Sequence, residues 1–134
     1  MTSLDTNIVV RLIVGDDLPQ ARAAERLIAS RPCRVAPSVL MECEWVLRAS
    51  YELDSRTIAA AFRDLLDLEN IEAAEPALTT RTLAAFEAGI DFADALHAAQ
   101  CVESEDFATF DRKFAARAAN AGLAKITLVR AAAN

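Results

Sequence analysis

The stretch GIDFADALHAA, residues 89–99, places two carboxylates in otherwise apolar sequence. Asp91 and Asp94 lie three residues apart, so a helix brings both onto one face, where they repel each other. Such crowding raises the pKa of at least one carboxyl group, and a bound cation relieves the repulsion. The pair therefore raises the question of what compensates its charge, and a bound cation is one answer.

Three further acids lie where an α/β protein binds ligands. Asp5 follows a predicted strand at 1–4, and Asp111 follows one at 106–110. Glu42 lies one turn into the helix after the second predicted strand. Ligands of parallel sheets collect at the carboxyl ends of the strands, so we expect these segments to meet there. The acids expected to converge are Asp5, Glu42, Asp91, Asp94 and Asp111.

Each acid also has a purely structural explanation. Asp91 and Asp111 can cap the helices that follow them, and Asp94 complements the dipole of its helix. Glu42 has Glu44 as a near neighbour, and either side chain can simply face solvent. An explanation by capping accounts less easily for Asp5.

Regularly alternating elements predict the fold class. Short strands are expected over 1–4, 33–37, 70–74, 106–110 and 125–129. Helices are expected over 7–14, 17–30, 38–51, 56–69, 76–88, 91–103 and 111–122, with caps at Ser38 and at Asp54 or Ser55 and an end at Gly89. Helices between strands imply parallel pairing. We therefore predict an α/β protein, a three-layer α/β/α sandwich with a central, mainly parallel sheet of about five short strands, in one domain over 1–134.

Composition narrows the classes of protein that fit. The 134 residues are 54% hydrophobic and carry a net charge of −6, which favours a compact globule without a broad basic surface. Cys33, Cys43 and Cys101 form no CxxC pair, and we expect buried thiols in a reducing compartment. The N-terminus lacks the pattern of a signal peptide and no run is long enough to span a bilayer, so we expect a soluble, cytoplasmic protein without membrane contact.

Four motifs in order resemble the PIN domain, and more closely the VapC-type ribonuclease toxins of bacterial toxin–antitoxin pairs. They are SLDTN, VLMECEWVLRASYEL, DFADALHAA and ATFDRKF, and the resemblance extends from Leu4 to about Val129. It implies an endoribonuclease that hydrolyses RNA phosphodiester bonds with a water molecule activated by Mg²⁺ or Mn²⁺. Whether one or two ions bind stays open.

The resemblance assigns the roles by position. It implies that Asp5, Glu42 (in place of Glu44), Asp94 and Asp111 are both the catalytic residues and the metal ligands. Supporting roles fall to Asn7, Asp91 and Thr109, whose hydroxyl can fix a carboxylate. His97 on its Ala-rich helix is interpreted as a packing or supporting residue in preference to a general base. Arg112 and Lys113 can contact RNA phosphate, although solvation is the simpler interpretation.

Partners are implied by the same resemblance. They are the RNA substrate, a small antitoxin protein that blocks the acidic site, and a second copy of the chain in a homodimer. Trp45 and Tyr51 fall in a helical stretch where core packing is the default expectation. That stretch and the helix containing Ile58, Phe62 and Leu65 can alternatively form a groove for an amphipathic partner helix.

Two other functions compete with the nuclease. A PIN-like scaffold would bind proteins without cleaving RNA, and its acids would only cap helices. Phosphoryl transfer through an aspartyl-phosphate is disfavoured, because LDTN lacks the second aspartate two residues on that such phosphatases use.

Overall fold

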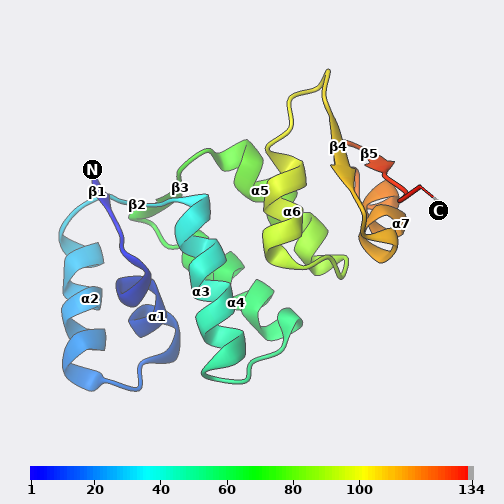
Figure 1. The fold of residues 1–134 in the computed structure, drawn as a ribbon. Coiled ribbons are helices and arrows are strands. Elements are labelled where there is room, and N and C mark those ends of the chain that lie inside the picture. The colour runs from blue at the N-terminus through cyan, green and yellow to red at the C-terminus, as the bar shows by residue number, and fades with distance from the viewer. Residues whose placement is uncertain (133–134) are drawn as a thin grey trace. The chain divides into compact units, whose positions relative to one another are not determined.

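The computed structural model describes residues 1–132, which contain seven helices and five strands (Figure 1). The chain divides into two compact units, Met1–Thr79 and Thr80–Asn134, and the boundary falls within helix α5 (Pro76–Glu87). None of the helices in this described part has the length and apolar character needed to cross a membrane. That residues 1–134 act as a single domain stays a prediction.

The first unit contains a parallel sheet of three very short strands in the order β1-β2-β3. They are β1 (Thr2–Ser3), β2 (Cys33–Val35) and β3 (Ile71–Ala73). Thr2 pairs with Cys33, and Cys33 pairs in turn with Ile71. The backbone N–H of Leu4 donates to the Arg34 carbonyl at 2.9 Å, so the pairing continues to the residue before Asp5. Asp5 therefore leaves the sheet at the carboxyl end of β1.

Four helices complete this unit and supply its core. They are α1 (Thr6–Val14), α2 (Leu18–Ser30), α3 (Pro37–Ala49) and α4 (Ser55–Leu66) (Figure 1). Each helix contributes apolar side chains that are nearly or fully buried, at helical spacing: Val9, Val10, Ala21, Ala24, Leu40, Cys43, Leu47, Ile58 and Phe62. Burying one such large side chain contributes ~1.5–3 kcal/mol to folding. The helical spacing of apolar residues thus identified the core face of α4, whereas on α3 it also included the exposed Trp45.

Side-chain caps begin most of these helices. Asp17 accepts a hydrogen bond from the backbone N–H of Gln20. Asp54, one of the two predicted cap residues of α4, accepts one from the backbone N–H of Thr57. The predicted cap at Ser38 is wrong, because α3 begins one residue earlier at Pro37 and makes no side-chain cap. Proline suits the first helical position, since it lacks the N–H that would otherwise need a partner there.

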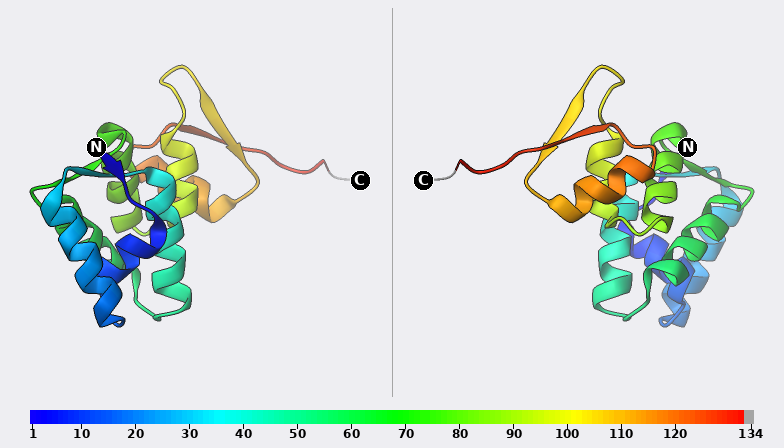
Figure 2. Two further views of the ribbon diagram at one scale, coloured as in Figure 1. Left: turned by 90° about the vertical axis from the view of Figure 1, so that its left-hand side faces the viewer. Right: turned by 90° about the vertical axis from the view of Figure 1, so that its right-hand side faces the viewer.

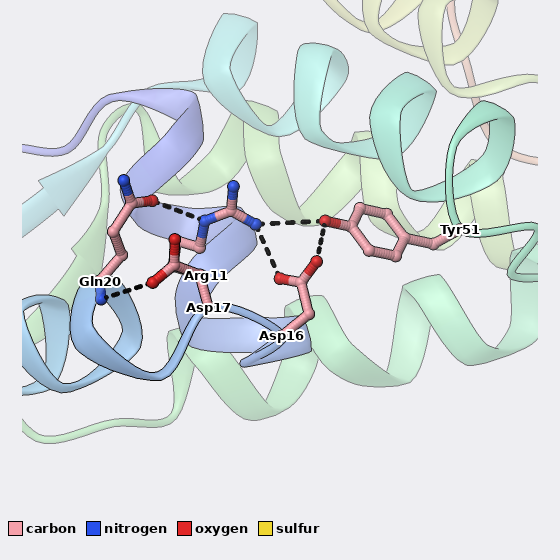
Figure 3. Close-up of polar contacts among 5 residues, drawn as sticks. All are labelled: Arg11, Asp16, Asp17, Gln20 and Tyr51. Carbon is pink, nitrogen blue, oxygen red and sulfur yellow. Dashed lines mark hydrogen bonds and ion pairs between the residues drawn. The ribbon is translucent and has the colours of Figure 1, made fainter.

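A polar network joins the end of α1 to the end of α3 (Figure 3). The Arg11 guanidinium donates to the Asp16 carboxylate at 2.7 Å, to Gln20 at 2.8 Å and to the Tyr51 hydroxyl at 3.2 Å. The Tyr51 hydroxyl in turn donates to Asp16 at 2.8 Å. Tyr51 is therefore a half-buried anchor for this network, where core packing was predicted.

The second unit contains the parallel strand pair β4 (Asp106–Thr109) and β5 (Lys125–Leu128), with α6 (Phe92–Ala99) and α7 (Arg112–Asn120). Figure 2 shows α7 alongside the two strands. Its core consists of buried side chains from the helices and of Ile90 in the loop before α6, with Phe107 and Ile126 of the strands packed against them; the buried members are Ala85, Ile90, Ala95, Ala98, Phe114 and Ala118. Gly89 ends the preceding helix with φ +99°, a conformation that favours glycine.

The predicted α/β class and parallel pairing are confirmed, and the differences are local. All five predicted strands form, but they pair as one three-stranded and one two-stranded sheet instead of one sheet. Helix α6 ends at Ala99, short of the predicted end near residue 103. A turn replaces its last residues, because Glu105 accepts a hydrogen bond from the Val102 N–H and its own N–H donates to the Val102 carbonyl.

Burial of the singled-out apolar residues also differs in part. Cys33 and Cys43 are buried as predicted, whereas Cys101 is only half-buried. Trp45, expected in the core, is 59% exposed on α3. The neighbouring core positions Cys43, Glu44 and Leu47 occupy the buried face of the helix, which leaves Trp45 on the outer face.

Candidate active site

In the first unit, two of the predicted acids meet around one buried threonine. Asp5 is the N-cap of α1 and accepts a hydrogen bond from the Thr6 backbone N–H at 2.8 Å. The Thr6 hydroxyl donates to the Glu42 carboxylate on α3 at 3.0 Å. Thr6 is 5% exposed, whereas both carboxylates reach the surface. A residue that sequence reasoning did not single out therefore connects Asp5 to Glu42.

The pKa of the Cys43 thiol is affected by the negative charges of Asp5 and Glu42. Cys43 is fully buried, and its Sγ donates to the Thr6 carbonyl at 3.7 Å. Burial, with the nearby negative charges of Glu42 and Asp5, raises the pKa of the Cys43 thiol to about 12. The thiol therefore stays protonated and is an unsuitable ligand for a soft metal.

Glu44, the neighbouring glutamate, has a different role from Glu42. It is 3% exposed and accepts from the Arg48 guanidinium on the same helix, at 2.9 and 3.3 Å. Its charge is therefore neutralised within α3. Glu42 is the glutamate of this stretch that reaches the surface beside Asp5. Asn7, the predicted helper, lies exposed in the first turn of α1.

In the second unit, three acids line one hollow of about 210 Å³. Asp91 precedes α6, Asp94 lies in its first turn, and Asp111 precedes α7. Ile90 and Phe114 are the apolar residues that line this hollow. The loop before α6 and the turn after β4 therefore bring together three carboxylates that are up to twenty residues apart in sequence.

Two of these acids, Asp91 and Asp111, use one carboxylate oxygen each to cap a helix. Asp111 accepts a hydrogen bond from the Phe114 N–H at 3.0 Å, and Asp91 accepts one from the Asp94 N–H at 3.4 Å. Each bond uses one oxygen, so the capping role does not exclude a ligand role. Asp5 also proves to be a cap, which the sequence had made less expected.

Asp94 is the acid of this group whose negative charge is disfavoured by its surroundings. Its carboxylate accepts no hydrogen bond within residues 1–132. Partial burial is the first cause that raises the pKa of Asp94 above its ordinary value, and the charges of Asp91 and Asp111 add to it. His97, one turn further along α6, opposes the shift by favouring the charged form. A positive charge placed near Asp94 would therefore stabilise its ionised carboxylate.

Two basic side chains also line the hollow. Lys113 and Arg117 lie one turn apart on α7, and Arg117 donates to the Gly89 carbonyl at 3.0 Å. Neither makes an ion pair to an acid in the described part of the chain. Sequence reasoning mentioned Lys113 but missed Arg117; their spacing of four residues on one helix was the available signal.

Comparison with known families decides the assignment. A family model of the PIN domain matches residues 3–120. This chain belongs to the PIN domain family. The PIN domain is generally a nuclease fold whose members act on RNA and usually bind divalent metal ions. A comparison with curated proteins found no match.

The donor chemistry of this PIN domain fits such an ion. The acids in question offer only carboxylate oxygens, which hard cations such as Mg²⁺ and Mn²⁺ prefer, and the penalty at Asp94 is one that positive charge relieves. No group of three or more His, Cys, Asp or Glu side chains within residues 1–132 is arranged to hold a metal. The convergence of Asp5, Glu42, Asp94 and Asp111 on one ion stays a prediction, with two of these acids in each unit.

Two supporting residues of the PIN domain have contacts that the sequence did not specify. The Thr109 hydroxyl oxygen accepts the backbone N–H of Asp111 at 3.0 Å and so shapes the turn after β4, while its predicted role of fixing a carboxylate stays a prediction. His97 is exposed and therefore packs against no core. Its effect on the pKa of Asp94 is the supporting role that remains for it.

Proposed function

We propose that this protein is a divalent-metal-dependent endoribonuclease. The observation that carries the proposal is the Asp94 carboxylate, half-buried beside Asp91 and Asp111 without a hydrogen-bond donor in the described residues. A folded protein tolerates such a carboxylate most readily where a ligand compensates it, and electrostatic penalties of this kind cluster at functional sites. Membership of a nuclease family supplies the class of ligand and reaction.

The metal ligands we propose are Asp5 and Glu42 from the first unit and Asp94 and Asp111 from the second. Asn7, Asp91 and Thr109 support them. When bound, one or two Mg²⁺ or Mn²⁺ ions activate water and neutralise charge on the phosphate. Thr6 holds Glu42 in place, and the capping bonds fix the backbone from which Asp5 and Asp111 project. Such orientation by outer partners sharpens metal binding.

RNA cleavage tests this function directly. Total RNA incubated with the protein should be cut internally in the presence of Mg²⁺ or Mn²⁺ and remain intact in chelator. Asp94→Asn should reduce cleavage by more than the ~10–100-fold that loss of an outer-shell partner costs. Asp54→Asn is the matched control, because Asp54 caps α4 with a comparable hydrogen bond and asparagine caps equally well. Cleavage that persists in chelator, or in Asp94→Asn, would contradict the proposal.

A double-mutant cycle tests whether both acid pairs bind the same ion. Glu42→Gln and Asp94→Asn are compared singly and together for the rise in melting temperature caused by Mn²⁺. Residues that share one ligand give non-additive effects, whereas independent sites give additive ones. We expect each single variant to lose most of the rise and the double variant to lose little more. Additive losses would show two separate sites.

We further propose that the nuclease is the toxin of a type II toxin–antitoxin pair and forms a homodimer. What supports a protein partner is an apolar groove of about 420 Å³ between α1, α2 and α4, away from the α3–α4 groove that the sequence suggested; its lining is Leu12, Ile13, Glu25, Ile28, Ala61, Asp64, Leu65 and Leu68. Glu25 and Asp64 suit an amphipathic helix with basic residues beside its apolar face. Exposed Trp45 on α3 is a candidate contact of the dimer.

Expression in bacteria tests the toxin role. Induction should arrest growth, Asp94→Asn should remove the arrest, and co-expression of the reading frame upstream of this gene should suppress it. Glu25→Lys and Asp64→Lys should weaken binding of that antitoxin without loss of RNA cleavage. Harmless expression of an active nuclease would contradict the toxin role while leaving the nuclease intact. Light scattering of wild type and Trp45→Ala tests the dimer.

A protein-binding scaffold without nuclease activity is the alternative. Its support is that Asp5, Asp91 and Asp111 all cap helices, so each has a structural function without a metal. In that case Asp111→Asn would leave every measured property almost unchanged, since asparagine and aspartate cap comparably. Loss of cleavage in Asp111→Asn at unchanged melting temperature would exclude the scaffold.

A further inference from the structure

Phe110 is the most exposed large hydrophobic residue of the described chain, at 73%. The other two phenylalanines of this segment are used by the fold, because Phe107 and Phe114 meet edge to face with their ring centroids 5.9 Å apart. Phe107 and Thr109 of β4 are half-buried, whereas Phe110 is the first residue after the strand and is exposed. The core of the second unit therefore forms without Phe110.

The backbone around Phe110 is held on both sides. The Thr109 carbonyl accepts the Val129 N–H at 2.8 Å, and the Thr109 hydroxyl accepts the Asp111 N–H at 3.0 Å. Asp111 in turn caps α7 through the Phe114 N–H. An exposed ring on a fixed backbone loses little entropy when it binds a ligand. Single exposed apolar residues are common, but this one is attached to a turn that three hydrogen bonds define.

Charge next to the ring identifies the chemistry of a ligand. Asp111 directly follows Phe110 and lines the acidic hollow, to which Lys113 and Arg117 also contribute. Lysine and arginine bind phosphate, and an unpaired base stacks on an aromatic face. Single-stranded RNA supplies both groups at neighbouring positions along one chain. An apolar protein surface fits less well, because exposed Asp111, Arg112 and Lys113 follow Phe110 directly.

We infer that Phe110 is a stacking platform for an unpaired base of single-stranded RNA, next to the phosphodiester that the acids bind. This inference rests on the proposed nuclease function and names a residue that positions its substrate. Lys113 and Arg117 contact the phosphates flanking that base. The aromatic ring thereby positions the nucleotide, and it favours single strands because a base within a duplex has no accessible face. Phe110 is a positioning residue and takes no part in the bond cleavage.

Binding of labelled oligoribonucleotides in chelator tests the inference without cleavage. The probes are a short oligoadenylate and an abasic chain of the same length, which carries phosphates but no bases. Phe110→Ala should weaken binding of oligoadenylate about 5- to 140-fold, the range that one stacked base supplies. Binding of the abasic chain should remain unchanged. Val102→Ala, a second exposed apolar residue of the same unit at 58%, is the matched control and should bind both probes normally.

Two further variants separate stacking from apolar contact. Phe110→Trp should restore oligoadenylate binding, whereas Phe110→Leu, which keeps an apolar side chain without a ring, should not. Equal affinity of Phe110→Ala and wild type, or full recovery in Phe110→Leu, would overturn the inference. A change from dimer to monomer in Phe110→Ala would also overturn it, since Phe110 would then be a subunit contact.

The inference and the proposed function fail in different ways. Oligoadenylate binding that depends on Phe110, in a protein that cleaves no RNA with any divalent ion, would overturn the nuclease and support the stacking platform. Metal-dependent cleavage with a Phe110→Ala variant of unchanged affinity would support the nuclease and overturn the platform alone.

Discussion

Asp16 and Asp94 show what two environments do to the same side chain. Asp16 lies in the polar network of the first unit, where Tyr51 and Arg11 both donate to it (Figure 3). The Tyr51 hydrogen bond is the first cause that lowers the pKa of Asp16. Asp94 in the second unit has no such donor within residues 1–132, and burial and two neighbouring acids raise its pKa.

The difference separates a structural carboxylate from a functional candidate. The charge of Asp16 is neutralised by partners that fold with it, so it joins the ends of α1 and α3 and needs no ligand. The charge of Asp94 is left to be compensated by something that the chain does not supply. A count of acidic residues would rank the two equally. Their partners distinguish them.

Stabilisation by Mn²⁺ should show the largest difference between variants of Asp16 and Asp94. At a metal concentration a hundredfold above its dissociation constant, we expect the free energy of unfolding of wild type to rise by ~2.7 kcal/mol. Asp16→Asn should retain this increase and Asp94→Asn should lose nearly all of it. Thermal or chemical unfolding with and without Mn²⁺ measures the effect. Equal responses of the two variants to Mn²⁺ would contradict the distinction between Asp16 as a structural carboxylate and Asp94 as a metal ligand.

Thr6→Val tests Glu42, which has a neutral hydrogen-bond donor, whereas Asp16 has a charged one and Asp94 has none within residues 1–132. Glu42 accepts a hydrogen bond from the neutral Thr6 hydroxyl, and valine removes that donor while keeping the buried shape. We expect ~0.5–1.5 kcal/mol lower stability in chelator and a ~10–100-fold weaker response to Mn²⁺. Titration of the melting temperature with Mn²⁺ separates the two effects. An unchanged Mn²⁺ affinity would exclude Glu42 as a ligand that Thr6 orients.

The pH dependence of stability should have opposite signs at the two acids. The raised pKa of Asp94 means that the folded state binds its proton more tightly, so its contribution is present below the ordinary value of 3.8 and is lost as pH rises through the raised pKa. Asp94→Asn should therefore melt higher than wild type near neutral pH, in chelator. The gap should close as pH falls.

The lowered pKa of Asp16 has the reverse consequence. Its contribution is present above the ordinary 3.8 and is lost as pH falls through the lowered pKa. Asp16→Asn should therefore melt below wild type near neutral pH, and that gap should also close on acidification. Melting curves of wild type and both variants across pH measure the two differences, and gaps of the same sign would contradict the assignment.

Tyr51→Phe should have the smallest effect. It removes the first cause of the lowered pKa of Asp16 and leaves the Arg11 ion pair in place. We expect the pKa of Asp16 to move toward 3.8 and the melting temperature to fall slightly, with RNA cleavage unchanged. Carboxyl-carbon NMR titration follows Asp16 directly. A loss of cleavage would show that this network serves the active site.

Local patterns predicted what local physics decides. Asp54, Asp91 and Asp111 cap helices as expected, because a cap is a contact between residues three apart in sequence. Ser38 failed as a cap because the adjacent Pro37 also suits a helix start, and sequence alone gave no measure of which would prevail.

Contacts distant in sequence were less accessible. The resemblance to the PIN domain assigned the metal-ligand role to Glu42 in place of Glu44, but nothing in the sequence indicated that buried Thr6 holds Glu42 from thirty-six residues away. Trp45 was expected in the core, since its helix is apolar on more than one face and only packing selects the buried one. The groove between α1, α2 and α4 was not predicted from the sequence for the same reason.

The sequence by itself determined the α/β class and the position of nearly every helix and strand, and it named the acids whose binding of a cation stays a prediction. These follow from side-chain periodicity and from carboxylate chemistry, which depend on neighbours along the chain. Only the tertiary structure decided which acids are already compensated, as Asp16 is, and which are left with an unfavourable charge, as Asp94 is. The reason is that burial and hydrogen-bond partners come from segments that folding alone brings together.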